Sequence, residues 1–187
     1  MHNTFFCYFL LYRGKLLCYD VIKSFMRQGG KIMLIRFAEN RDVPALLTLL
    51  RQVGAVHHDL RPDLFRSNAC KYGPSQLFAL LENSDTPIFV AEEAGAVVGY
   101  GFCQIKKTEK DPVLQDRLTL YIDDLCVLEG YRGKHIGSGI YAEIVRYAKM
   151  RKCHAITLNV WAGNTAAEQF YESLGLKPQK TTMETVL

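Results

Sequence analysis

The chain has 187 residues, of which 49% are hydrophobic and 22% charged, with 14 glycines and 6 prolines. This ordinary globular composition excludes a disordered chain, a collagen and a coiled coil, and the length predicts a single domain. No apolar run reaches the roughly 20 residues that span a bilayer, so residues 33–187 are predicted to need no membrane.

The net charge of +4 comes entirely from the first 32 residues. Five basic side chains in this segment face one acidic side chain, whereas residues 33–187 hold 18 basic and 18 acidic side chains. Those later residues contain no basic cluster with interleaved aromatics. The sequence therefore argues against a nucleic-acid partner.

Residues 1–32 fit no tidy element, and three interpretations stay open. Residues 5–12 resemble a short signal core, but a basic start and a cleavage site are missing. An amphipathic membrane helix is an alternative. The favoured hypothesis is a translated leader, because Gly29-Gly30-Lys31 before Met33 can be encoded by a purine-rich run that resembles a bacterial ribosome-binding site. Met33 would then start a bacterial protein, whereas the alternative is a genuine N-terminal extension.

The six cysteines predict neither a zinc site nor a thioredoxin-like site. None of them forms a C-x-x-C pair. Cys103 and Cys126 lie in apolar runs and are expected to be buried. Without a secretion signal, reduced thiols and a cytoplasmic location are expected, and no metal is predicted.

From Met33 onward the hydrophobic pattern predicts a mixed α/β sheet. A strand over 33–38 precedes a helix that Asp42 caps and that His57 and His58 end. The further elements are a helix over 75–81, strands over 87–91, 96–102 and 118–128, a helix over 137–149, a strand over 155–161, a helix from Asn164 to Gly175 and a strand over 181–187. The order predicts antiparallel strands first and a C-terminal βαβ crossover.

A glycine-rich turn links the strand over 118–128 to the next helix. It comprises Arg132, Gly133, Lys134, His135, Ile136, Gly137, Ser138 and Gly139. Glycines let a ligand approach the backbone, and the first amides of a helix attract phosphates. A Walker A loop is excluded because its pattern is missing, and a dinucleotide site is disfavoured because residues 130–134 separate the strand from Gly137. A purely structural turn is the bland alternative.

Two motifs in this order resemble the GNAT superfamily of N-acetyltransferases. The family's coenzyme pattern, Q/R-x-x-G-x-G/A, is met by Lys134, Gly137 and Gly139, with a lysine in the first slot. Residues 164–176, NTAAEQFYESLGL, resemble the family's N-x-x-A-x-x-F-Y-x-x-x-G-F helix, with Leu176 in place of the aromatic. The resemblance covers residues 33–187 and implies a GNAT-like fold that binds acetyl-CoA.

The resemblance also implies roles for individual residues. Backbone groups of Leu125, Cys126 and Val127 would bind the pantetheine arm, residues 132–139 the pyrophosphate, and Asn164 and Tyr171 the coenzyme near its sulfur. A phenol can protonate a departing thiolate. The alternative is that Phe170 and Tyr171 form only a packing pair.

Adjacent carboxylates in an apolar strand are costly to bury, and Asp123-Asp124 is such a pair. Its surroundings resemble the E-D pair of diamine (spermidine/spermine) acetyltransferases, which implies that Asp123, then Asp124, binds or deprotonates the amine through a water. On a regular strand the two side chains would point to opposite faces. A solvated strand end or a bulge with capped carboxylates is the alternative.

The sequence thus predicts an N-acetyltransferase that transfers acetyl from acetyl-CoA to a primary amine in a ternary complex. The expected acceptor is a small diamine, with a peptide or protein amine as the alternative. A silent acyl-CoA-binding sensor is the alternative from another class. A homodimer is compatible with the resemblance.

Overall fold

The computed structural model describes residues 23–28 and 31–187, with side chains from Met33 onward. These described residues form a mixed sheet of six strands in the order β1 to β6. The strands are β1 (Lys23–Gln28), β2 (Lys31–Phe37), β3 (Ile88–Glu93), β4 (Ala96–Thr108), β5 (Arg117–Val127) and β6 (Ala155–Leu158). All neighbours are antiparallel except β5 and β6, which confirms the predicted fold class and crossover.

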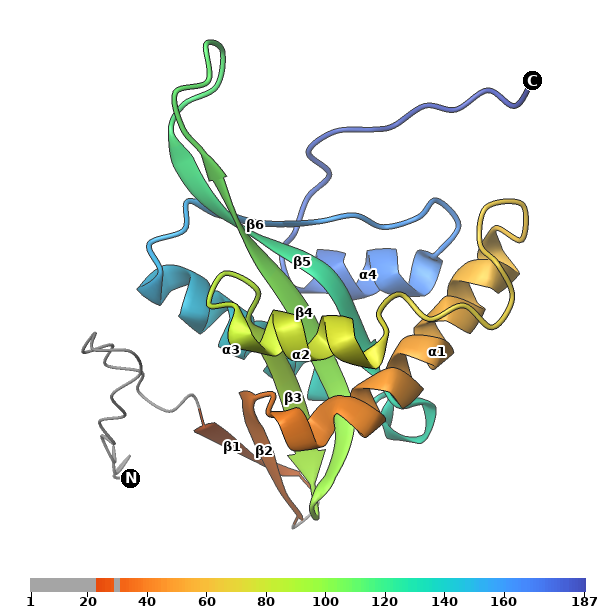
Figure 1. Cartoon of the computed structure of the whole chain (residues 1–187), viewed down its shortest axis with the longest axis vertical. Helices are drawn as coiled ribbons and strands as arrows, with labels where there is room; N and C mark the ends of the chain where they lie inside the picture. Colours follow the sequence, from red (N-terminus) through yellow and green to blue (C-terminus); the bar gives the residue numbers. More distant parts are fainter. Residues whose placement is uncertain (1–22, 29–30) are drawn as a thin grey trace.

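Helices cover both faces of the sheet (Figure 1). They are α1 (Val43–Leu60), α2 (Pro74–Glu82), α3 (Ile136–Met150) and α4 (Thr165–Ser173), with 3-10 turns at Asn40–Asp42 and Glu129–Tyr131. Leucines of α1 and α2 pack with Tyr100 and Phe102 on one face. Isoleucines of α3 pack with Leu120 and Ile122 on the other. The site described below lies where these two layers meet the carboxyl end of β5.

Two glycines of β4 leave room for side chains of α3 against the sheet. A Cβ atom added at Gly101 would come within 2.9 Å of Ile144 and 3.0 Å of Ile140 on α3. At Gly99 it would meet Cδ1 of Ile140 at 3.2 Å and the carbonyl oxygen of Cys126 on β5 at 3.0 Å. Since packed interiors leave no room for such atoms, the two glycines set the position of α3 and therefore of its N-terminus.

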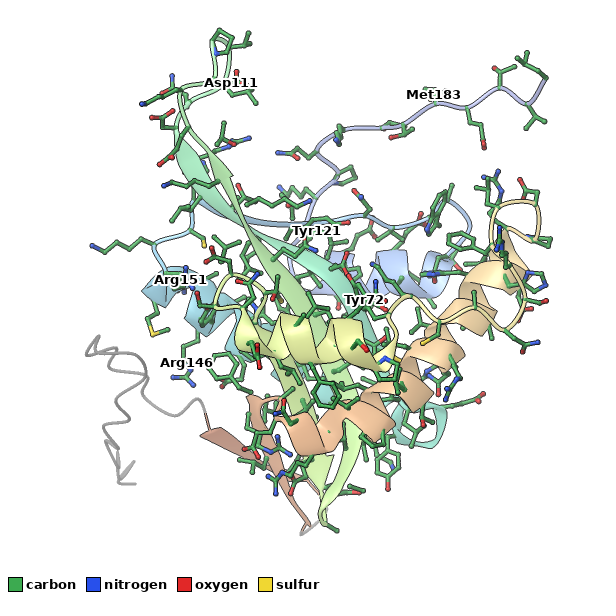
Figure 2. All side chains as sticks on the ribbon, viewed as in Figure 1. Tyr72, Asp111, Tyr121, Arg146, Arg151 and Met183 are labelled. Atoms are coloured by element: carbon green, nitrogen blue, oxygen red, sulfur yellow. The ribbon has the colours of Figure 1, made fainter. Side chains whose placement is uncertain are left out.

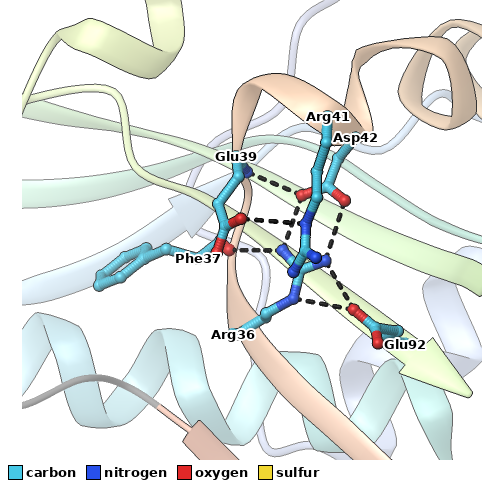
Figure 3. A network of polar contacts seen from close by, with 6 residues as sticks. All are labelled: Arg36, Phe37, Glu39, Arg41, Asp42 and Glu92. Carbon is cyan, nitrogen blue, oxygen red and sulfur yellow. Dashed lines mark hydrogen bonds and ion pairs between the residues drawn. The ribbon is translucent and has the colours of Figure 1, made fainter. Parts of the chain in front are cut away.

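A buried ion network anchors the start of α1 to the sheet (Figure 3). Arg36 of β2 donates to both carboxylate oxygens of Asp42, at 2.7 and 2.9 Å, and to Glu92 of β3, at 2.6 Å. The backbone N–H of Glu39 also donates to Asp42. The side chains of Arg36 and Asp42 are only 4% exposed, and losing one partner of such a pair costs about 3–5 kcal/mol. The network therefore fixes where α1 begins.

Four predicted elements differ from the structure. The strand over 96–102 continues to Thr108. The first helix does not end at His57 and His58, because both lie in the last turn of α1, which runs to Leu60. The strand over 155–161 ends at Leu158. The strand expected over 181–187 is wrong: the tail runs away from the sheet (Figure 1), so its backbone has no neighbouring strand to pair with among the described residues.

The hypothesis of a translated leader before Met33 concerns residues that lie largely outside the described ones, and it stays a prediction. Residues 23–28, which are described, form β1 and pair with β2. In the described part of the chain, no helix is long and apolar enough to cross a membrane.

Candidate active site

Strands β5 and β6 separate at the carboxyl end of their pairing. The parallel register runs from Thr119 opposite Ala155 to Ile122 opposite Leu158 and stops there. Strand β5 continues to Val127, so within the described part of the chain its last five residues have no β6 neighbour. Within the described residues 31–187, this stretch of β5 therefore has no strand partner on the β6 side, and the resemblance places the pantetheine arm along it.

A β-bulge lies at the same point and changes the direction of the two carboxylates. Strand β4 pairs Phe102 with Asp124 and the next residue, Cys103, with Ile122, so Asp123 is the extra residue. An extra residue breaks the alternation of a strand. Consequently Asp123 and Asp124 both contact tyrosines of the layer that contains α1 and α2. Opposite faces were expected only for a regular strand, and the structure instead has the bulge that was the alternative, with both carboxylates accepting hydrogen bonds.

Asp123 is held by two neighbouring residues from the loop before α2. The hydroxyl of Tyr72 donates to its Oδ2 at 2.6 Å, and the Lys71 ammonium lies 2.8 Å from the same oxygen. Tyr72, labelled in Figure 2, stacks on Phe102 with ring centroids 5.6 Å apart. Burial, followed by the hydrogen bond to Asp123, raises the pKa of the Tyr72 phenol. Tyr72 therefore stays a neutral donor.

Asp124 is the carboxylate whose ionisation is most perturbed. Burial raises the pKa of this carboxyl to about 6, although the hydrogen bond from Tyr100, 2.8 Å long, and the charge of Lys71 oppose the shift. The nearby charge of Asp123 adds to it. A carboxyl with such a pKa can exchange a proton near neutral pH.

Tyr171 of α4 lies within electrostatic reach of Asp124. Burial raises the pKa of its phenol, and the charge of Asp124 raises it further. Its neighbour Phe170 takes the packing role, since the Phe170 ring lies against Gly137 of α3. The two rings of the pair meet edge to face at 5.1 Å. Tyr171 is thus a protonated phenol beside the acidic pair.

The glycine-rich turn supplies the N-terminus of α3. His135 adopts a left-handed conformation immediately before Ile136, and Gly133 has a φ of 75°. Gly139 donates to the carbonyl of His135, so α3 begins there, and the first amides of a helix have no internal partner. A Cβ atom at Gly130 or Gly133 would meet nothing within 4 Å. This open, amide-rich turn fits a pyrophosphate.

Side chains of the turn fold back onto it. Arg132 donates to the carbonyl of Val127 at 3.4 Å, and Lys134 donates to that of Gly130 at 3.2 Å. The Val127 carbonyl also accepts from Gln52 of α1 at 3.2 Å, so this one backbone group of the predicted pantetheine set already has partners. Ser138 is half-buried, and its side chain is an uncharged hydroxyl. The side chain of Asn164, where the predicted helix begins, caps α4 by accepting a hydrogen bond from the backbone N–H of Ala167.

The sequence did not predict four residues that contact the candidate site: Gln52, Lys71, Tyr72 and Tyr100. Gln52 contacts Cys126 and Val127 from 74 and 75 residues away, and Tyr72 contacts Asp123 from 51 residues away. Nothing local marks such partners. An aromatic group at the end of α1 was also missed: Phe65 lies 5.0 Å from the His57 ring and 5.2 Å from that of Trp161.

No group of three or more metal-ligating side chains lies close together in the residues for which the structure gives side chains.

Comparison with known proteins agrees with this geometry. The sequence model of the Acetyltransferase (GNAT) family matches residues 53–176. An uncharacterized N-acetyltransferase of Methanocaldococcus jannaschii is 29% identical over 104 residues, which cover 54% of this chain and 43% of that protein. The match thus spans less than half the length of that relative.

Two solved structures share the fold. A variant of the BH1408 protein of Bacillus halodurans is 37% identical, with a TM-score of 0.79 over 82% of this chain and 98% of its own. The aminoglycoside N-acetyltransferase AAC(6')-Iy in complex with CoA is 14% identical, with a TM-score of 0.65 over 87% of this chain and 99% of its own.

Proposed function

The chain belongs to the Acetyltransferase (GNAT) family and is an acetyltransferase, and on this premise we propose that it transfers the acetyl group of acetyl-CoA to a primary amine by direct attack in a ternary complex. One observation carries the proposal. The bulge at Asp123 directs two carboxylates to one face at the point where β5 and β6 separate. An acceptor ammonium and a thioester could meet there.

The coenzyme site would consist of the turn and the open edge of β5. Amides at the N-terminus of α3 would bind the pyrophosphate, with Arg132 and Lys134 turning toward it from their backbone contacts. Leu125 and Cys126 would offer backbone groups to the pantetheine arm. When bound, acetyl-CoA supplies an acetyl group activated as a thioester.

The two carboxylates would have different roles toward the amine. Asp123, which already binds an ammonium group, would hold the incoming one. Asp124 would take its proton, directly or through a water, because burial places the pKa of this carboxyl at about 6. Tyr171, kept protonated by burial, would give a proton to the departing sulfur. Tyr72 and Tyr100 hold the two carboxylates in place.

The acceptor that fits best is a small amine with more than one positive charge. Two carboxylates lie where β5 and β6 separate. The Phe65 ring contacts His57 in the last turn of α1 and the ring of Trp161, and a second cation could stack on these aromatic rings. The structural neighbour AAC(6')-Iy is named for aminoglycosides, which are polyamines, and this similarity at 14% identity supports the fold only.

The test is thiol release from acetyl-CoA by the full chain with a panel of amines. The panel holds putrescine, spermidine, a lysine analogue, an aminoglycoside and a short peptide. We expect turnover with diamines that falls sharply in Asp123→Asn and Asp124→Asn. A matched control is Asp116→Asn, because Asp116 lies outside the site, in the β4–β5 loop. Turnover with the peptide alone would overturn the choice of a small acceptor, and coenzyme binding without any turnover would overturn the proposed reaction.

A further inference from the structure

The Lys71 ammonium occupies the position that the proposed function gives to the acceptor. Its Nζ lies 2.8 Å from Oδ2 of Asp123 and donates to the carbonyl of the same residue at 3.3 Å. Its charge also acts on Asp124, which in turn acts on Tyr171. Lys71 therefore belongs to the same cluster as the groups that would take up and supply protons.

The backbone of Lys71 is fixed beside the site by its neighbours. Gly54 of α1 lets the loop come close, since a Cβ atom there would clash with the carbonyl oxygen of Ala69. The thiol of Cys70 donates to the carbonyl of Tyr72, and Tyr72 is held by Asp123 and Phe102. The side chain of Lys71 is 45% exposed, so its four-carbon stem can still move over this fixed base.

A lysine side chain is chemically one end of an alkyl diamine: a primary ammonium on a flexible aliphatic stem. We propose that Lys71 is itself an acceptor and becomes acetylated in its own active site when no free amine displaces it. The proposal rests on the proposed function. It differs from the general acetylation of surface lysines, because Lys71 is held on the catalytic carboxylates while Lys107, for example, pairs with Glu109 outside the site.

The reaction balances without a further reactant. The Lys71 ammonium gives one proton to a carboxylate of the pair, and its free nitrogen forms a bond to the acetyl carbon. The bond between that carbon and sulfur breaks, and the sulfur leaves with the second proton of the nitrogen as free coenzyme A thiol. The products are a neutral amide at Lys71, the thiol, and one proton that the carboxylate releases to water.

Acetylation would also change the site. A neutral amide cannot pair with Asp123 as the ammonium does, so the carboxylate would become available to an external amine. Lys71 would then act as a temporary occupant of the acceptor position.

The experiment uses the full chain, isotope-labelled acetyl-CoA and no added amine, followed by peptide mass spectrometry. The label excludes acetyl groups acquired during expression. We expect Lys71 to be labelled at least about tenfold faster than Lys107, because it is held near the thioester. The rate per molecule should not change on dilution, since the step is intramolecular, and an added diamine should slow it.

Variants separate this proposal from the proposed function. Asp123→Asn should lower labelling of Lys71 to the rate of Lys107, and Lys71→Arg should remove the label at position 71 while labelling of Lys107 stays the same. Equal labelling of Lys71 and Lys107 in a protein that acetylates free amines overturns this proposal alone. Coenzyme binding with no acetylation of either an amine or Lys71 overturns the proposed function, and this proposal with it.

Discussion

The hydroxyl of Tyr100 donates a 2.8 Å hydrogen bond to Asp124, and this bond joins the centre of the core to the proposed active site. Tyr100 is fully buried between α1 and the sheet. Burial raises the pKa of the Tyr100 phenol far above its usual range, so it stays a donor. The bond lowers the pKa of Asp124, while burial of that carboxyl raises it to about 6.

The pH dependence of kcat/KM should reflect the pKa of the Asp124 carboxyl. If Asp124 takes the proton of the amine, kcat/KM should fall about tenfold per pH unit below about pH 6, because only the charged carboxylate is a base. Tyr100→Phe removes the hydrogen bond that favours the charged form, so it should move this acid limb toward higher pH. Steady-state kinetics across the pH range measures both.

A histidine provides the control for this profile. Burial, followed by the charge of Lys71, lowers the pKa of His57, which could also produce an acid limb. His57→Gln should leave the limb in place. A limb that disappears in His57→Gln and is unmoved in Tyr100→Phe would contradict the role given to Asp124.

Replacing Asp124 by a neutral residue should lower activity but raise the free energy of unfolding. Its folded-state pKa is raised, so folding is favoured by protonation, and this favourable contribution is lost as the pH rises from about 4 to about 6. Asp124→Asn should therefore stabilise the fold at neutral pH by about 1–3 kcal/mol and have little effect near pH 4. Urea unfolding at the two pH values tests this, and a variant destabilised equally at both would contradict it.

Tyr171→Phe should lower kcat by about 10- to 100-fold, as expected for losing a proton donor. The ring and its contact with Phe170 remain, so the Kd for acetyl-CoA should hardly change. Tyr141 is the matched control, because it is another partly buried tyrosine in the electrostatic surroundings of Tyr171. Tyr141→Phe should keep kcat near that of the wild type. Equal losses in both variants would mean that Tyr171 acts only in packing.

Local patterns predicted most of the fold. The helical spacing over 137–149 predicted α3 within one residue at each end. The predicted strand over 181–187 does not form, and the reason is physical. A strand needs a partner, and the segment around Met183 lies away from the sheet (Figure 2). The side chains of Met183 and Val186 remain more than 80% exposed.

The site could be predicted only in part. The cost of burying two carboxylates marked Asp123 and Asp124, but their common direction depends on how β5 pairs with β4. The sequence offered a bulge only as an alternative, because a bulge is a property of two paired strands and cannot be recognised with certainty in one of them. Lys71 and Tyr72 meet Asp123 only because the loop after α1 folds back over the sheet.

Gly137 should prove essential for coenzyme binding through its contact with α4. A Cβ atom there would lie 3.0 Å from Cζ and 3.3 Å from Cε2 of Phe170, so in Gly137→Ala the Phe170 ring of α4 must shift by a few tenths of an ångström. Overpacking of this kind costs about 1–3 kcal/mol. We expect weaker coenzyme A binding by isothermal titration calorimetry. In Gly130→Ala, where the new atom meets nothing within 4 Å, affinity should be unchanged. Adding Phe170→Leu to Gly137→Ala should restore part of the affinity, because the smaller side chain makes room. No recovery in the double variant would show that the added methyl obstructs the ligand itself rather than the packing of α4.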